Sequence, residues 1–299
     1  MRNLMRVNFL RWKNKLSTVY CLIGIICLSA INCVTVYTQK TIGGDTVCNL
    51  TVYPILMIAA LLVTGAAVLL NRGEGDPIRN AVIAGYSKTK ILLAELPPAL
   101  VFACIASLIM LLPMLRAPSV LMRFPAAYIL LGALGILLMF CLAAVLCVIL
   151  SMNCTTRTVA IIGSAAVLLG GYFCTTPLCE ALMEPQTIPV VQETFDKTEG
   201  RHLVKESSRL NPEYIAPPNR TRVTAITMML PQTAVSLSAI YLDISIIPTD
   251  EYAIYEREEL EWSRNQCESM MRMLPLCETG MLLLITVLGL LRFRRTDMN

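Results

Sequence analysis

Long apolar runs alternate with shorter polar segments along the chain, and this pattern predicts the architecture. Six runs come close to the ~20 residues with which an α-helix crosses ~30 Å of hydrocarbon. We expect the membrane-spanning helices at about 16–37, 52–70, 91–113, 125–150, 158–174 and 276–291. The pattern therefore predicts an all-α polytopic membrane protein with six transmembrane helices.

The composition agrees with a membrane protein. Hydrophobic residues make up 56% of the 299 residues and charged residues 15%, whereas soluble domains carry roughly 25% charged residues. That much apolar surface does not fit into a water-soluble core of this size. The net charge of +4 is modest, and no basic stretch is interleaved with aromatic residues. We therefore expect membrane lipid, and no nucleic acid, among the partners.

Few residues are suited to catalysis. His202 is the only histidine and lies in a polar segment, and the twelve cysteines include no CxxC pair. The expected spans contain no Ser/His pair, no paired Asp and no set of metal ligands. We therefore expect no catalytic residue, no metal site and no enzymatic activity in this chain.

Basic residues in the short segments that flank the spans predict the orientation. One side of the membrane carries thirteen of them and the other side three, and the richer side belongs in the cytoplasm. The thirteen are Arg2, Arg6, Arg11, Lys13, Lys15, Arg72, Arg79, Lys88, Lys90, Arg157, Arg292, Arg294 and Arg295. The three are Lys40, Arg116 and Arg123. Both termini are therefore expected inside (N-in/C-in).

Residues 175–275 are then a large extracytoplasmic loop between the fifth and sixth helices. A segment of this length crosses the membrane largely regardless of its charge. It holds nine of the sixteen prolines, so we expect irregular structure with short elements in its first half. A helix is expected from near Asp250 to about Leu274. A second helix at about 223–241 is expected to break at Pro231.

The cytoplasmic loop between the second and third spans contains a short helix by its capping signals. Asp76 is a good N-cap, Pro77 suits the first helical position, and Gly85 suits the position just after the helix. Ile78, Ala81 and Val82 form a small apolar face, while Arg79 and Asn80 point elsewhere. A short helix tied directly to two spans is suited to act as a lever, although a plain interfacial connector has the same pattern.

Three stretches resemble bacterial ABC-2 type exporter permeases. The stretch EGDPIRNAVIAGYSK, from Glu74 to Lys88, is similar to their E-x-G-T-I-R-N-K-x-x-x-G-x-S-R pattern. The external NPEYI at 211–215, Arg220 or Arg222, and LPQT at 230–233 resemble their N-P-x-Y-[IV] … R … L-P-[TS]-G-Q pattern. The basic ending at 291–297 is also similar. Asp-Pro replaces a small residue and Thr in the first pattern, and Gln-Thr stands where Gly-Gln is common in the second.

The resemblance implies a transmembrane permease subunit of an ABC exporter in the bacterial cytoplasmic membrane. No Walker A pattern occurs in the chain, so ATP and Mg would be bound by a separate ATP-binding cassette ATPase subunit. That subunit would dock on the coupling helix 76–85, and a second permease subunit would complete the path in a homo- or heterodimer. The residues expected to couple to the ATPase are Asp76, Pro77, Ile78, Arg79, Asn80, Val82, Ile83 and Gly85.

The first fifteen residues resemble the interfacial elbow helix of such permeases. Leu4, Phe9, Leu10 and Trp12 would be partly immersed in the membrane. Simple positive-inside anchoring is an equally good interpretation. In either case the residues expected to lie at lipid phosphates are Arg2, Arg6, Arg11, Lys13 and Lys15. The domain plan is thus 1–15, the helices of 16–174, the loop 175–275, and the last helix with its basic tail at 276–299.

One acid near the membrane has two interpretations. Glu95 is expected to be an interfacial carboxylate that pairs with Lys88 or Lys90, and the alternative is a role in moving protons or substrate. Because we expect no buried charge in the spans, an amphipathic, lipid-like or peptide cargo is favoured over a small ion. A competing function is a membrane-anchored sensing or interaction protein that works through its 175–275 region.

Overall fold

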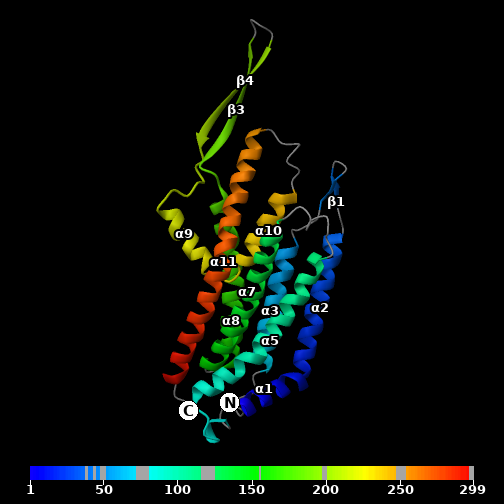
Figure 1. The fold of residues 1–299 in the computed structure, drawn as a ribbon, viewed down its shortest axis with the longest axis vertical. Helices are drawn as coiled ribbons and strands as arrows, with labels where there is room; N and C mark the ends of the chain where they lie inside the picture. Colours follow the sequence, from blue (N-terminus) through cyan, green and yellow to red (C-terminus); the bar gives the residue numbers. More distant parts are fainter. Residues whose placement is uncertain are drawn as a thin grey trace.

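The computed structural model describes residues 1–37, 40–42, 45–47, 52–71, 81–115, 125–154, 156–196, 201–246 and 254–295. It is an elongated bundle of helices from which a long β-hairpin projects at one end (Figure 1). We call the end that carries α1 and the last residues of α11 the basal end, and the end that carries the hairpin the distal end. The helices are α1 (Arg2–Asn14), α2 (Leu16–Tyr37), α3 (Tyr53–Asn71), α5 (Lys88–Leu115), α7 (Ala126–Asn153), α8 (Arg157–Met183), α9 (Asn219–Met228), α10 (Thr233–Ile246) and α11 (Ile254–Arg295).

Six of the described helices are long and apolar enough to cross a membrane, and they confirm the prediction of a multi-pass α-helical membrane protein. The apolar stretches cover Leu16–Thr35, Tyr53–Asn71, Lys88–Pro113, Ala126–Asn153, Thr158–Met183 and Glu261–Arg295. The fifth helix is longer than its predicted range because it continues through Pro177. Proline is tolerated within membrane helices, where neighbouring groups satisfy the backbone that it frees.

The last helix departs from the expectation of two helices separated near Pro275. α11 instead runs without a break for 42 residues and includes Pro275 in its interior. Pro275 has no backbone N–H, so the helix loses one hydrogen bond there. Met271 and Leu274, just before it, are buried, and their packing holds this part of the helix in place. On the basal side of the proline, Thr279 Oγ1 donates to the carbonyl of Pro275 at 2.7 Å. Packing thus keeps the helix continuous where local propensity predicts its end.

The first half of 175–275 is more regular than the expected irregular structure with short elements. Strands β3 (Thr187–Asp196) and β4 (Arg201–Leu210) form an antiparallel hairpin in which Thr187 pairs with Leu210 and Asp196 with Arg201. Of the eight prolines of this segment that the structure describes, only Pro189 lies in a strand. A proline count averaged over the whole segment does not show that two ten-residue stretches within it, which together contain one proline, can pair as β-strands. A second, short hairpin joins β1 (Lys40–Ile42) and β2 (Asp45–Val47).

The predicted break near Pro231 is confirmed. α9 and α10 meet there at an angle of 109°, and the pair is apolar enough to count as one broken span or a re-entrant loop. The turn is held from inside the bundle. Gln232 Nε2 donates to the carbonyl of Leu168 at 2.8 Å, and Thr233 Oγ1 donates to the carbonyl of Thr227.

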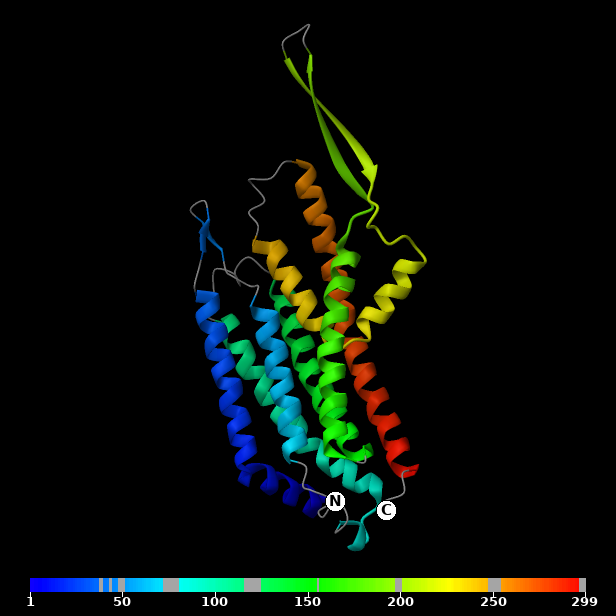
Figure 2. The same ribbon diagram turned by 180° about the vertical axis from the view of Figure 1, so that it is seen from behind.

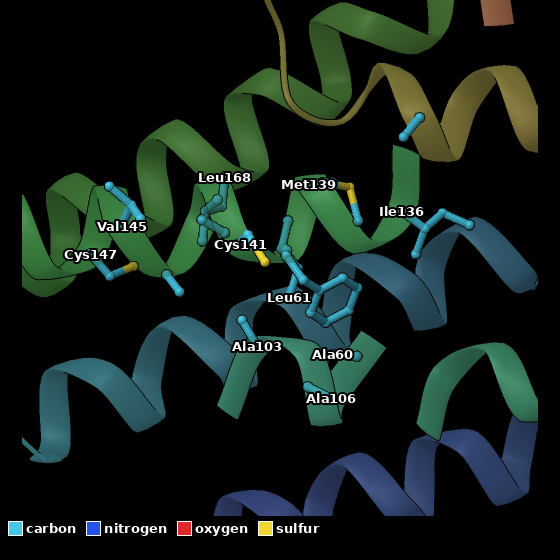
Figure 3. Close-up of a cluster of buried hydrophobic side chains, with 14 of the residues drawn as sticks. Ala60, Leu61, Ala103, Ala106, Ile136, Met139, Cys141, Val145, Cys147 and Leu168 are labelled. Carbon is cyan, nitrogen blue, oxygen red and sulfur yellow. The ribbon is translucent and has the colours of Figure 1, made fainter. Parts of the chain in front are cut away.

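The core lies where α3, α5, α7 and α8 meet (Figure 3). Small residues such as Ala60, Ala103 and Ala106 are completely buried there, which lets the helices approach closely. Larger side chains, among them Leu61, Met139 and Leu168, fill the remaining space. Among the six candidate spans, α3 and α7 are the most buried, whereas α2, α8 and α11 leave broad apolar faces uncovered.

Candidate functional site

The described part of the predicted coupling helix is its last turn, and it has the predicted cap. Gly85 has a φ of +82°, its N–H donates to the carbonyl of Val82 at 2.9 Å, and the N–H of Tyr86 donates to that of Ala81 at 3.0 Å. These two bonds are the Schellman pattern that ends a helix. The role of Gly85 as the terminating residue is confirmed. The other candidate residues of this helix, Asp76, Pro77, Ile78, Arg79 and Asn80, lie outside the described residues.

The last turn presents one side to the protein and another outward. Ala81 is buried in the core cluster, and Tyr86 packs against that cluster. Ile83 is 74% exposed, and Val82 is also exposed. The turn therefore contacts the bundle through Ala81 while it leaves two apolar side chains available at the basal end. An apolar contact from outside the chain could form on this face.

Helix α1 lies across the basal end rather than along the bundle (Figure 2). It is joined to α5 by an ion pair, since Arg11 Nη2 lies 2.7 and 2.5 Å from the two carboxylate oxygens of Glu95. Asn8 Nδ2 also donates to the carbonyl of Ala94 at 3.0 Å, and Trp12 packs its ring against Phe102 at 5.7 Å between centroids. Because Glu95 pairs with Arg11, the expectation that it pairs with Lys88 or Lys90 was wrong.

The junction of α1 and α2 is also joined to the end of α3. Lys15 Nζ donates to the carbonyls of Leu70 and Asn71, both at 3.2 Å, and so caps the last turn of that helix. Ser17 and Thr18 donate to Asn71 Oδ1 at 3.3 and 3.0 Å. The N-terminal segment thus holds both helices that flank residues 72–87. We call the contacts of α1 with α5, together with those of Lys15, Ser17 and Thr18 with Asn71 and Leu70 of α3, the basal clamp.

The basal clamp uses two of the five residues that were predicted to anchor the chain at the membrane surface. Arg11 and Lys15 are engaged within the protein, whereas Arg2, Arg6 and Lys13 are exposed on α1. Trp12 is buried against the bundle and not immersed in the membrane as expected. Anchoring at lipid phosphates remains a prediction for the three exposed cations.

At the distal end, the structure brings together residues of the second sequence pattern. Asn211 Nδ2 donates to Glu184 Oε2 at 2.8 Å and to the carbonyl of Pro185 at 3.1 Å, which joins the base of the hairpin to the end of α8. Arg220 lies between the rings of Tyr214 and Trp262, 4.9 Å from each centroid. Its Nη2 also donates to the carbonyl of Leu182.

The two arginines that the pattern left open differ in their surroundings. Arg222 is exposed, whereas Arg220 contacts the rings of Tyr214 and Trp262 and the carbonyl of Leu182. Arg220 is therefore the residue that the structure places in this cluster. Trp262 was missed by sequence reasoning because it lies 42 positions further along the chain, on α11.

A buried acid in the last span was missed altogether. Glu278 on α11 is only 2% exposed, and neither of its carboxyl oxygens has a hydrogen-bond partner among the described residues. It lies fourteen residues before Arg292, about 21 Å along the helix axis. The expectation that the spans hold no buried charged residue was wrong. Because such residues are costly inside a membrane, they are functional candidates.

Within the described residues, no group of three His, Cys, Asp or Glu side chains is placed to hold a metal ion. No protein-family model matches the chain, and no curated protein or solved structure is significantly similar to it.

Proposed function

We propose that this chain is the transmembrane permease subunit of an ABC-2 type exporter in the bacterial cytoplasmic membrane. A separate ATP-binding cassette subunit would hydrolyse ATP, and a second permease subunit would complete the transport path. The basal end would face the cytoplasm, and the hairpin would lie outside. The observation that carries this proposal is the basal clamp, together with the capped turn at Ala81–Ile83 between the two helices that the clamp holds.

The basal clamp provides a route for force. A partner that moves residues 76–85 would pull on α3 and α5, because α3 ends shortly before that segment and α5 begins shortly after it. The bonds of Lys15 to α3 and of Arg11 and Asn8 to α5 would make α1 move with them. Since packed helices move as rigid bodies, a displacement at the basal end would reach the path between the spans.

The exposed turn supplies the test of this proposal. The chain is purified in mild detergent from the membranes of its own host, and any associated ATPase is identified and assayed for ATP hydrolysis. Ile83→Asp is expected to lower the amount of associated ATPase at least tenfold, because it places a charge in an apolar contact. Leu210→Asp is the matched control, since Leu210 is 70% exposed at the distal end. Equal ATPase association in both variants would refute the coupling role.

The distal structure supports a second candidate function, a sensing or interaction protein. The β3–β4 hairpin projects from the bundle and has two strand edges, which are suited to pair with an added strand. Replacement of residues 190–207 by a two-residue Asn-Gly turn discriminates between the two functions. A transporter would keep its ATPase partner and its ATP hydrolysis, whereas a sensor would lose its ligand while the spans remain folded.

A further inference from the structure

An apolar groove of about 690 Å³ runs along the outside of the bundle between α9 and α11. Its volume lies within the roughly 300–1,000 Å³ of ordinary ligand pockets. Methionines supply much of its wall, namely Met228, Met229, Met273 and Met281. Because methionine is flexible and polarizable, such a wall adapts to irregular apolar chains. The groove is suited to hydrocarbon.

One end of the groove carries a cation. Arg220 lines the groove, and none of the lining residues, all of which the structure describes, is acidic. Its Nη1 is buried and has no hydrogen-bond partner among the described residues. Arg220 also forms no ion pair within the described part of the chain. Since a guanidinium favours carboxylate and phosphate oxygens, this end of the groove is suited to an anionic ligand.

Arg220 lies on α9, and its level measured along the neighbouring α11 matches that of lipid head groups. Its neighbour Trp262 precedes Arg292 by thirty residues, which is about 45 Å along the helix. A bilayer with its head groups is ≈ 40–45 Å thick. With Arg292 at the inner head groups, Arg220 and the rings of Tyr214 and Trp262 lie at the outer head groups. Tryptophan and tyrosine are enriched at that level of membrane proteins.

The rest of the groove follows one face of α11 towards the basal end. Its lining residues Gln266, Met273, Cys277, Met281 and Leu284 recur at intervals of seven, four, four and three, which is the spacing of a single helix face. From Gln266 to Leu284 this face extends about 27 Å. The groove thus leads from a head-group cation into the depth of the acyl chains.

We propose that this groove binds an anionic phospholipid of the outer leaflet, with its phosphate at Arg220 and an acyl chain along α11. The phosphate provides the acceptor that Arg220 Nη1 lacks, and the acyl chain covers the methionine wall. This proposal rests on the proposed orientation, with the basal end in the cytoplasm, but it requires no ATPase partner. It therefore can be tested on the chain alone.

Trp262 offers a direct probe, because the chain has only two tryptophans. Trp12→Phe leaves Trp262 as the sole tryptophan, which is excited selectively over the tyrosines, and the protein is placed in lipid nanodiscs. Phosphatidylglycerol or phosphatidylcholine, spin-labelled near the glycerol end of the acyl chain, is added at equal mole fractions. We expect phosphatidylglycerol to quench Trp262 at least threefold more strongly, and unlabelled phosphatidylglycerol to reverse the quenching.

Three variants in this background locate the site. Arg220→Gln is expected to remove the preference for phosphatidylglycerol, while Arg222→Gln, on the same helix but exposed, is expected to keep it. Gly280→Leu fills the groove without altering Arg220, because no atom lies within 4 Å of a Cβ built at Gly280. It is expected to reduce the quenching by both lipids.

Three outcomes would overturn the proposal. The first is equal quenching by the two lipids, and the second is a preference that survives Arg220→Gln. The third is a different occupant. A second copy of the chain would be revealed by disulfide crosslinking between copies of Gly280→Cys, and a free fatty acid by stronger quenching from the spin-labelled acid than from phosphatidylglycerol.

Discussion

Arg11 on α1 holds both carboxylate oxygens of Glu95 on α5 from a single nitrogen, and the two side chains are only 17% and 13% exposed. The pair joins residues 84 positions apart and fixes α1 to the beginning of a spanning helix. A charged pair with so little exposure is costly to break, because the remaining partner becomes an unpaired buried charge.

Removal of one partner tests the energetic weight of this pair. Arg11→Ala is expected to lower the free energy of unfolding by about 3 kcal/mol, and Arg11→Ala with Glu95→Ala by less than the sum of the single variants. Denaturation in detergent measures both. Arg6→Ala, an exposed arginine on the same helix, is the control and is expected to change stability by less than about 0.5 kcal/mol. Additive single variants would show that the pair contributes no coupling.

The glycine at the end of the predicted coupling helix allows a second test. Gly85→Ala forces a Cβ into a φ of +82° and is expected to cost about 1 kcal/mol. Amide hydrogen exchange should show weaker protection at Tyr86, whose N–H closes the cap. Gly163→Ala is the matched substitution, because Gly163 lies inside α8 with no atom within 4 Å of the added Cβ. It is expected to stabilise the protein by about 0.5–1 kcal/mol, opposite in sign.

Two neighbouring glycines on α8 test how the turn between α9 and α10 is held. A Cβ at Gly171 would lie 2.3 Å from Gln232 Oε1, whereas a Cβ at Gly170 has no atom within 4 Å. Gly171→Ala is therefore expected to destabilise the protein by about 1–3 kcal/mol, and Gly170→Ala to be neutral or stabilising. The melting temperature in detergent checks both. Gln232→Ala added to Gly171→Ala should recover part of the loss, and equal melting temperatures of the two glycine variants would contradict the packing.

Glu278 leads to a prediction of increased stability. Its two carboxyl oxygens are buried without hydrogen-bond partners among the described residues, so Glu278→Leu removes an unfavourable desolvation. We expect the free energy of unfolding to rise by about 1–3 kcal/mol. Glu268→Leu on the same helix is the control with the opposite sign, because Glu268 Oε1 accepts hydrogen bonds from Tyr241 and Arg264. A destabilising Glu278→Leu would mean that Glu278 has a partner that this geometry does not include.

Much of the architecture follows from the sequence. The six spans were predicted because hydropathy is summed over contiguous residues, and the number and order of the spanning helices agree with those sums, whereas α8 ends later and α11 begins earlier than predicted. The cap at Gly85 and the break at Pro231 were also predictable, since both depend on the backbone preferences of one or two residues. The hairpin β3–β4 was missed because the proline content of a hundred residues says little about two ten-residue strands.

The tertiary structure alone decided which side chains meet. The sequence by itself determined that Glu95 lies near a membrane boundary and that Arg220 or Arg222 belongs to a motif. Only the packing of α1 on α5 selected Arg11 as the partner of Glu95, and only the approach of α9 to α11 placed Arg220 against Trp262. The free energies of forming, capping and ending a helix depend on neighbours along the chain, so they can be predicted from the sequence. A contact between residues 84 positions apart depends on how whole helices pack, which no single segment specifies.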